Sequence, residues 1–406
     1  MSDDPPVAVI GESDGRWRTS TLCLAADFGS RDDPAGQGGA AHMLEHLLMS
    51  APLDGGPSLS ERIERLGGQA NAVTGLDQMF FQAQVLSAHV PEVVGLLTRA
   101  VLEPRLDDQV LDTERQAVLQ ELAAADADPS DTVQDAFLAA VFPEHPLGRP
   151  VGGTVQDIDG LTLTDVLAVH REVLLRRRMA LVCTGGTGPI EAAKHLAAPE
   201  TETETKSKTA TPTAPLAELT PGPWRPHEGG SGEFSWFATG GRAPSMSDPR
   251  RHAYNILAHL LGPSPSSLLY RRLRGREGLV YAFFAWSRHY TEAGAWRIMA
   301  GVEHHNLGRA QEVVRELLLE VAGHGPEPED LAVARRQAVM ELVTGAERPW
   351  DHAMTLGRET ALGTRPWNVE EGIRALEAVS AEEVRSAAAA IADRQITVVR
   401  PTGEPG

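Results

Sequence analysis

The sequence predicts an α+β fold built from two homologous α/β-sandwich domains, the product of an internal duplication. Three observations support this prediction. The segment Pro199–Pro215 contains six threonines and three prolines but no large apolar residue, so it divides the 406-residue chain as a linker. The two sides repeat one order of elements, and within each side amphipathic helical patterns lie between short apolar strands.

In the first half, strands are predicted where short apolar runs lie between turn residues. Helices are predicted where apolar residues recur every three or four positions, as in Pro91-Glu-Val-Val-Gly-Leu-Leu-Thr-Arg-Ala-Val101. The expected order is strand 20–28, helix 41–48, strand 79–85, helices 91–101 and 112–122, and strand 178–183.

The second half repeats these elements in the same order. It adds strands at 233–239 and 396–400 and a hairpin over 278–302. Four pairs of segments align the halves: 41–48 with 254–261, 79–85 with 280–286, 91–101 with 310–319, and 115–122 with 336–342. We therefore predict a first domain over residues 1–197, a linker over 198–222 and a homologous domain over 223–406.

Composition excludes several classes of protein. Apolar residues make up 42% and charged residues 23% of the chain, which is ordinary for a globular protein. No apolar run approaches the ~20 residues of a membrane span, so no membrane partner is expected. Cys23 and Cys183 lie in apolar runs, which predicts two buried thiols rather than a disulfide framework.

Charge and the N-terminus bear on partners and location. The net charge is −19, of which residues 1–200 carry −16. This excess argues against nucleic acid and could attract cationic peptides, although a solubilising surface is the better explanation. The start, Met1-Ser-Asp-Asp-Pro-Pro, has neither a basic region nor an apolar signal core. We expect a cytoplasmic, bacterial protein.

The motif His42-Met-Leu-Glu45-His46 carries the most chemical information in the chain. On a helix the two histidines are four residues apart and share one face, where both can bind one Zn²⁺. Glu45 would lie beside the metal and could take a proton from a zinc-bound water. The apolar residues between them would face the core. The alternative is a pair of ordinary histidines on an amphipathic helix.

A catalytic zinc needs a third protein ligand, and the helix over 112–122 offers two candidates. Glu114 and Glu121 are seven residues apart and therefore share a helix face. One could bind the metal while the other orients a ligand. By spacing alone, a solvated acidic face is the better explanation of both glutamates.

The motif resembles the pitrilysin family of zinc metallopeptidases, which includes insulin-degrading enzyme and the mitochondrial processing peptidase. Glu121 follows His46 by 75 residues and Glu114 precedes Glu121 by seven, as in that family. The resemblance implies the processing-peptidase-like metallohydrolase fold, with zinc ligands His42, His46 and Glu121. It also implies that Glu45 is the general base and that Glu114 contacts a zinc ligand without binding the metal itself.

Two further segments are similar to the family. Gly67-Gly-Gln-Ala-Asn71-Ala72-Val-Thr74 looks like its edge strand, which implies that Asn71 and Ala72 bind substrate by β-augmentation. Arg274 and Tyr281 are seven apart, like the family's Arg/Tyr pair, which holds the substrate carbonyl and the oxyanion. The alternatives are an ordinary turn into a strand and a basic helix followed by an aromatic residue.

The second half has the fold without the full motif. Asn255 stands where the first half has His42, and Ala258 where it has Glu45. His259 matches His46 but has no second donor at ligand spacing, so we expect a core histidine there and one zinc per chain.

The resemblance implies a zinc-dependent endopeptidase that cleaves peptides or unfolded segments in an enclosed chamber. Family members of this length pair, so a homodimer, or a heterodimer with a related chain, is expected. Arg274 and Tyr281 would then act on the other chain's zinc. Two alternatives remain: a specialised leader-peptide processing protease with a related partner, and a non-catalytic structural subunit of the same family.

Overall fold

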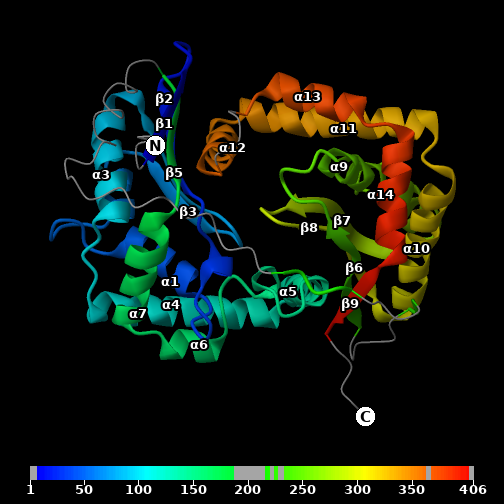
Figure 1. Ribbon diagram of the computed structural model, residues 1–406, viewed down its shortest axis with the longest axis horizontal. Coiled ribbons are helices and arrows are strands. Elements are labelled where there is room, and N and C mark those ends of the chain that lie inside the picture. The colour runs from blue at the N-terminus through cyan, green and yellow to red at the C-terminus, as the bar shows by residue number, and fades with distance from the viewer. Residues whose placement is uncertain (1–6, 187–214, 220–223, 227–232, 363–366, 402–406) are drawn as a thin grey trace. The chain divides into compact units, whose positions relative to one another are not determined.

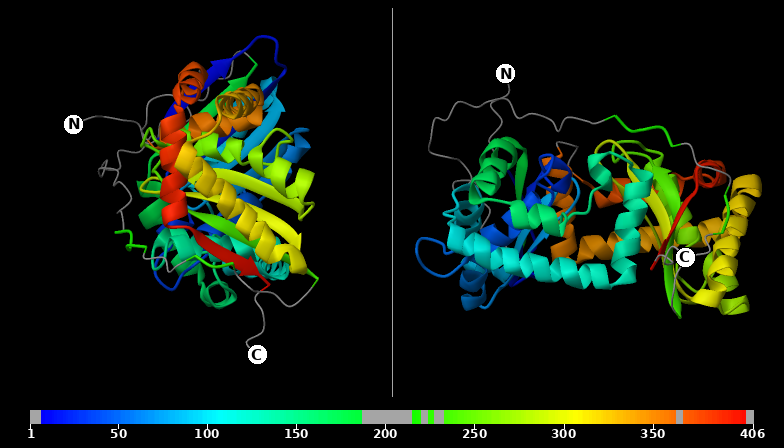
Figure 2. Two further views of the ribbon diagram at one scale, coloured as in Figure 1. Left: turned by 90° about the vertical axis from the view of Figure 1, so that its right-hand side faces the viewer. Right: turned by 90° about the horizontal axis from the view of Figure 1, so that it is seen from below.

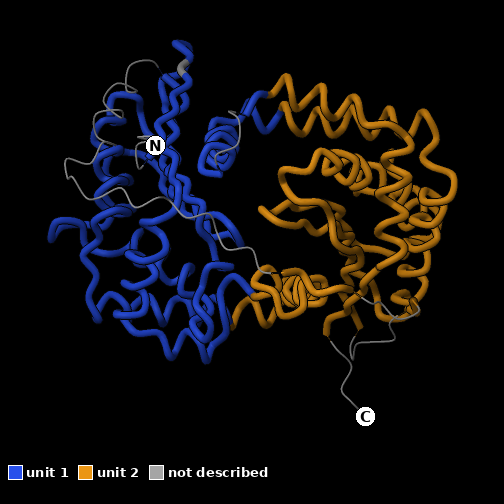
Figure 3. Tube along the Cα trace, in the orientation of Figure 1, with its two compact units in different colours: residues 1–122, 150–212, 344–368 blue, residues 123–149, 213–343, 369–406 orange. Residues whose placement is uncertain are grey.

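The computed structural model describes residues 7–186, 215–219, 224–226, 233–362 and 367–401. Most of the predicted linker, and the predicted boundary at 197, lie outside these residues. The chain forms two compact units (Figure 3): unit 1 comprises Met1–Leu122, Pro150–Pro212 and Thr344–Asn368, and unit 2 comprises Ala123–Arg149, Thr213–Val343 and Val369–Gly406. Each unit therefore takes one segment from the other half of the chain.

Unit 1 is built on a five-stranded mixed sheet with the order β1-β5-β2-β4-β3 (Figure 1). Strand β1 runs parallel to β5, and the other neighbours are antiparallel. The sequence analysis did not predict β1. The strands are β1 Val7–Ser13, β2 Thr19–Ala26, β3 Gln69–Thr74, β4 Met79–Leu86 and β5 Met179–Gly185.

Both faces of this sheet are covered, which explains why its central strand β2 is buried from Ser20 to Ala26 and apolar from Leu22 onward. Leu22 and Leu24 face the main core, whereas Cys23 and Ala25 face helix α12. The main core lies under helices from the first half of the chain. These are α1 Ala40–Ser50, α2 Leu59–Arg65, α3 Val90–Leu102, α4 Asp108–Ala127, α6 Val155–Gly160 and α7 Leu163–Ala168.

Helix α12, Pro349–Ala361, comes from the second half of the chain and packs on β5 and β2 of unit 1. A small residue allows the close approach. A Cβ on Gly357 would lie only 2.9 Å from the Cβ of Ala25. Cys23 is buried under this helix and Cys183 in the main core, and neither forms a disulfide, which confirms the predicted buried thiols.

Unit 2 is built on a four-stranded antiparallel sheet with the order β7-β8-β6-β9. Helices α10 and α14 lie side by side over one face (Figure 2), and α5 from the first half packs on β9 and β6. The strands are β6 Phe234–Ala243, β7 Val280–His289, β8 Gly294–Glu303 and β9 Ile396–Arg400. The helices are α5 Pro129–Val141, α9 Arg251–Leu260, α10 Leu307–His324, α11 Pro328–Glu347, α13 Val369–Ala378 and α14 Ala381–Asp393.

The two sheets share one strand order, because β3-β4-β2-β5 in unit 1 corresponds to β7-β8-β6-β9 in unit 2. The predicted α+β class with an internal duplication is confirmed. One predicted equivalence between the two halves is wrong. Segment 79–85 lies in β4, one strand in from the edge of its sheet, whereas segment 280–286 lies in the edge strand β7. Both segments are rich in aromatic residues, and that shared composition suggested an equivalence that the topology does not support. Across the described ranges, no helix is long and apolar enough to cross a membrane.

Candidate metal centre

Helix α1 carries the predicted motif on its less buried face. Met43, Leu44, Leu47 and Leu48 are at most 2% exposed, which confirms that these residues face the core. The carboxylate of Asp33 caps the helix by accepting hydrogen bonds from the amides of Gly39 and Ala41, both at 2.8 Å. The cap and the apolar face fix the direction of the remaining side chains.

Three possible ligand atoms converge between α1 and α4. The Nε2 atoms of His42 and His46 lie 3.3 Å apart, and Glu121 Oε2 lies 3.7 Å from the first and 3.4 Å from the second. A tetrahedral zinc with ligands at about 2.0–2.2 Å separates its ligand atoms by about 3.3–3.6 Å. The donor set therefore fits a zinc ion. Throughout the described ranges, these residues form the one such group of three or more side chains.

The surroundings of both imidazoles favour the form that can bind a metal through Nε2. His46 Nδ1 lies 3.2 Å from Glu114 Oε2, so a proton on Nδ1 leaves Nε2 free to accept a metal. Burial, with a smaller contribution from His46, lowers the pKa of His42 to about 4. His42 is therefore neutral near pH 7, as a metal ligand must be.

Glu45 lies on the same helix face as the two histidines. Its Oε2 accepts a hydrogen bond of 2.5 Å from the hydroxyl of Thr74, the last residue of β3. Burial raises the pKa of the Glu45 carboxyl, and the hydrogen bond from Thr74 opposes that rise. Thr74 was not predicted as a site residue, because its contact depends on the register of β3 against α1.

Strand β3 is the edge of the unit 1 sheet and carries Asn71 and Ala72. It pairs with β4, with Asn71 opposite Gln82 and Ala72 opposite Phe81. Asn71 is exposed and Ala72 is half-buried, following the alternation of the strand. An edge strand presents backbone groups to which an extended peptide can bind.

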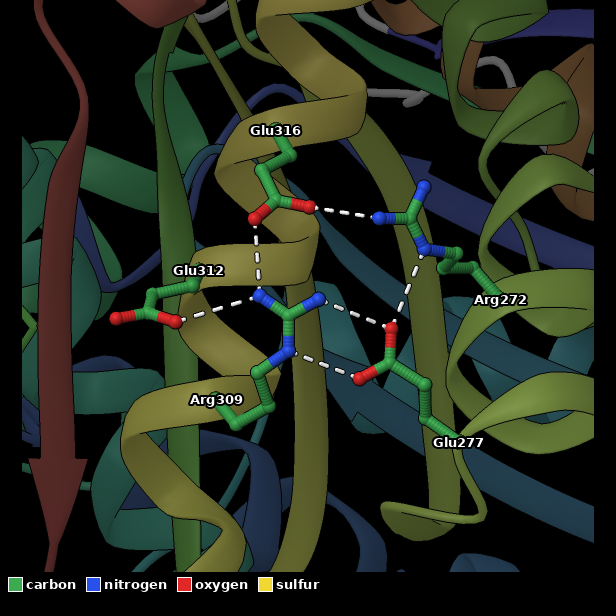
Figure 4. Close-up of polar contacts among 5 residues, drawn as sticks. All are labelled: Arg272, Glu277, Arg309, Glu312 and Glu316. Atoms are coloured by element: carbon green, nitrogen blue, oxygen red, sulfur yellow. Dashed lines mark hydrogen bonds and ion pairs between the residues drawn. The ribbon is translucent and has the colours of Figure 1, made fainter.

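Arg274 and Tyr281 lie in unit 2 and are not part of this cluster. A closed ring of charges holds their segment to α10 (Figure 4): Glu277 binds Arg272 and Arg309, and Glu316 binds the same two arginines. Glu312 makes a further contact with Arg309. The neighbouring Arg271 is paired with Asp330 at 3.0 Å.

Arg274 differs from these paired arginines. Its guanidinium lies 5.6 Å from the ring centroid of Tyr270, and no carboxylate within the described part of the chain pairs with it. Tyr281 lies on the edge strand β7 and is 81% exposed. Both side chains are exposed, as a ligand-binding pair requires and as a basic surface helix followed by an aromatic residue would also show.

Unit 2 corrects one expectation about the second half. His259 does not stand alone in a core: its Nε2 lies 3.4 Å from Glu341 Oε2, the same separation as between His46 and Glu121. Helices α4 and α11 both have 20 residues, with Leu111 and Leu331 buried at the same helix position. Glu341 is therefore the counterpart of Glu121. The sequence analysis missed this pair because it sought a second donor only at helical spacing from His259, although the aligned segments 115–122 and 336–342 both end in Glu-Leu.

A duplicated α+β fold that carries a His/His/Glu group beside a further carboxylate is typical of a metallohydrolase. Two family models make the class specific. "Insulinase (Peptidase family M16)" matches residues 8–155, and "Peptidase M16 inactive domain" matches residues 160–338. The chain belongs to the M16 family of peptidases, which supports a peptidase function.

Similar proteins point the same way. An uncharacterized zinc protease of Mycobacterium leprae is 27% identical over 376 residues, 91% of this chain and 84% of the relative. The beta subunit of the mitochondrial-processing peptidase of Blastocladiella emersonii is 25% identical over 97% of this chain and 86% of its own. A protease from Helicobacter pylori has the same fold, with a TM-score of 0.84, 18% identity and 97% of each chain covered. Such relatives indicate a zinc-dependent metallopeptidase.

Proposed function

We propose that this chain is a zinc-dependent endopeptidase that cleaves peptides or unfolded segments in an enclosed chamber. One observation carries the proposal: His42, His46 and Glu121 bring three ligand atoms together at separations that suit a tetrahedral zinc. These residues would hold one zinc per chain. The bound ion would supply Lewis acidity at the scissile carbonyl and lower the pKa of water toward ~7.

The residues around the ligands would carry the proton. Glu45 lies on the same helix face and is the proposed general base, which accepts a proton from the attacking water and passes it to the leaving amine. Burial raises its pKa, which makes it a stronger base than an exposed glutamate. Glu114 would orient His46 through the contact of 3.2 Å at Nδ1.

The edge strand β3 is the proposed substrate site. Asn71 and Ala72 would pair through their backbones with an extended peptide, which gives affinity without demanding one side-chain sequence. This mode of binding suits substrates that are unfolded or short, because a folded segment cannot present a free strand.

Arg274 and Tyr281 are proposed to hold the substrate carbonyl and to stabilise the oxyanion. In a homodimer, each chain's pair would act on the zinc centre of the other chain. A mixed dimer of Glu45→Gln and Tyr281→Phe chains tests this arrangement. If the pair acts across the dimer, one of the two sites contains both substitutions and the other neither, so about half of the activity remains. If it acts within one chain, each site contains one substitution and activity is lost.

A second candidate is a specialised processing protease, such as one that removes leader peptides, working with a related partner chain. The similarity to a protein named as one subunit of a processing peptidase favours this alternative. A non-catalytic structural subunit is less well supported, because every proposed ligand is present in this chain.

The test is cleavage of a mixed peptide library by the purified protein, with and without a chelator, alongside its zinc content. About one zinc per chain and chelator-sensitive cleavage are expected. Glu45→Gln is the matched control and should retain zinc but lose turnover. Zinc without cleavage would favour a missing partner or a dedicated substrate, and absence of zinc would overturn the ligand assignment.

A further inference from the structure

One hydroxyl group connects the edge strand to the residue proposed as the base. In β3 the side chains of Ala70, Ala72 and Thr74 are the less exposed ones and share a face. That face lies toward α1, because Ala70 and Ala72 pack against the core to which α1 contributes. The Thr74 hydroxyl donates to Glu45 Oε2 at 2.5 Å.

The end of β3 is held firmly, so this donor has a fixed position. The amide of Gly75 donates to the carbonyl of Gln78 at 2.7 Å, and the amide of Ser30 donates to the carbonyl of Gly75 at 3.0 Å. A glutamate side chain has three rotatable bonds and would otherwise sample several orientations. The Thr74 hydroxyl at Oε2, together with a hydrogen bond from the Thr74 backbone amide to the same carboxylate, limits that freedom.

We propose that Thr74 is a positioning residue for Glu45: it orients the carboxylate and sets its place relative to a peptide paired with β3. This inference rests on the proposed peptidase function. Thr74 itself needs no contact with the reacting atoms. Its role is geometric, since one strand would both bind the substrate backbone and hold the base.

The experiment compares Thr74→Val, which removes the hydroxyl but keeps the β-branched shape, with Thr74→Ser, which keeps the hydroxyl. Thr98→Val is the matched control, because it removes a threonine hydroxyl that donates to the carbonyl of Val94 within α3, away from the proposed substrate strand. For a peptide that the wild-type protein cleaves, Thr74→Val should lower kcat about 10- to 100-fold. KM and zinc content should stay near the wild-type values, and Thr74→Ser and Thr98→Val should retain most of kcat.

Crystal structures supply a readout besides activity. Glu45 should keep its orientation in Thr74→Ser and lose it in Thr74→Val. A wild-type kcat in Thr74→Val would overturn the inference. So would an equal loss in Thr74→Ser, or an unmoved Glu45 in Thr74→Val. A wild-type protein that binds no zinc or cleaves no peptide would instead overturn the proposed function, and this inference with it.

Discussion

Helices α1 and α4 of unit 1 and helices α9 and α11 of unit 2 occupy the same places in two copies of one fold. Both pairs keep a histidine and a glutamate 3.4 Å apart. They differ at three positions, where unit 1 has His42, Glu45 and Glu114 and unit 2 has Asn255, Ala258 and Ala334. The fold depends on apolar positions that both copies keep, whereas the metal centre depends on a donor set that only α1 and α4 complete. Fold and site are therefore separable within one chain.

Substitution of Tyr281 tests whether unit 2, which lacks the complete metal centre, contributes a catalytic side chain instead. Tyr281→Phe removes an exposed hydroxyl on β7 that we propose as an oxyanion donor. Because a lost donor of this kind costs about 10²- to 10³-fold in kcat, a decrease of that size is expected in peptide cleavage assays. Tyr270→Phe is the control, since it keeps the ring over which Arg274 lies. A wild-type rate in Tyr281→Phe would leave unit 2 without the proposed catalytic part.

Glu114→Ala copies the residue of unit 2 into unit 1. It removes the carboxylate that lies 3.2 Å from His46 Nδ1, so the imidazole loses its orienting partner. Loss of such a contact weakens metal binding about 10- to 100-fold, which competition with a fluorescent zinc chelator would measure. Glu114→Gln should fall between the wild type and Glu114→Ala. Unchanged affinity in both variants would show that this contact does not support the metal.

The histidine pair could be predicted from local spacing, whereas the choice of Glu121 as the third ligand came from the family resemblance. His42 and His46 share a helix face wherever that helix lies, and Glu114 and Glu121 are two turns apart on another. The contact from Thr74 to Glu45 could not be predicted in this way, since it joins a strand to a helix through tertiary packing. The His259–Glu341 pair was missed for the same reason, since it joins α9 to α11 through tertiary packing.

The fold shows the same division. The strands and helices follow from apolar periodicity, and the duplication follows from their order. The exchange of α5 and α12 between the units does not, because an amphipathic helix does not specify which sheet it will cover. The aromatic strands were paired wrongly because composition carries no information on position within a sheet.

Acid should destabilise the protein through its buried histidines. In unit 2, burial, with smaller contributions from Arg251 and His289, lowers the pKa of His252 to about 4, and in unit 1 burial lowers the pKa of His170. The unfolded chain then binds protons first, so these histidines cost no stability well above about pH 6.5, and the free energy of unfolding decreases as the pH falls below it. For His252 the decrease continues to about pH 4. Thermal unfolding in chelator should show this slope, and His252→Gln should reduce it. An equal slope in that variant would contradict the assignment.

The central claim is that α1 and α4 complete a metal centre, and that α9 and α11 keep two of its three ligands. The most direct test is the zinc content of three purified proteins: the wild type, His42→Asn and Asn255→His, with Asn255→Gln as the control. We predict about one zinc per chain in the wild type and in Asn255→Gln, almost none in His42→Asn, and about two in Asn255→His. Zinc retained by His42→Asn, or no zinc in the wild type, would contradict the claim for unit 1. No additional zinc in Asn255→His would contradict the claim that unit 2 keeps two of the three ligands in place.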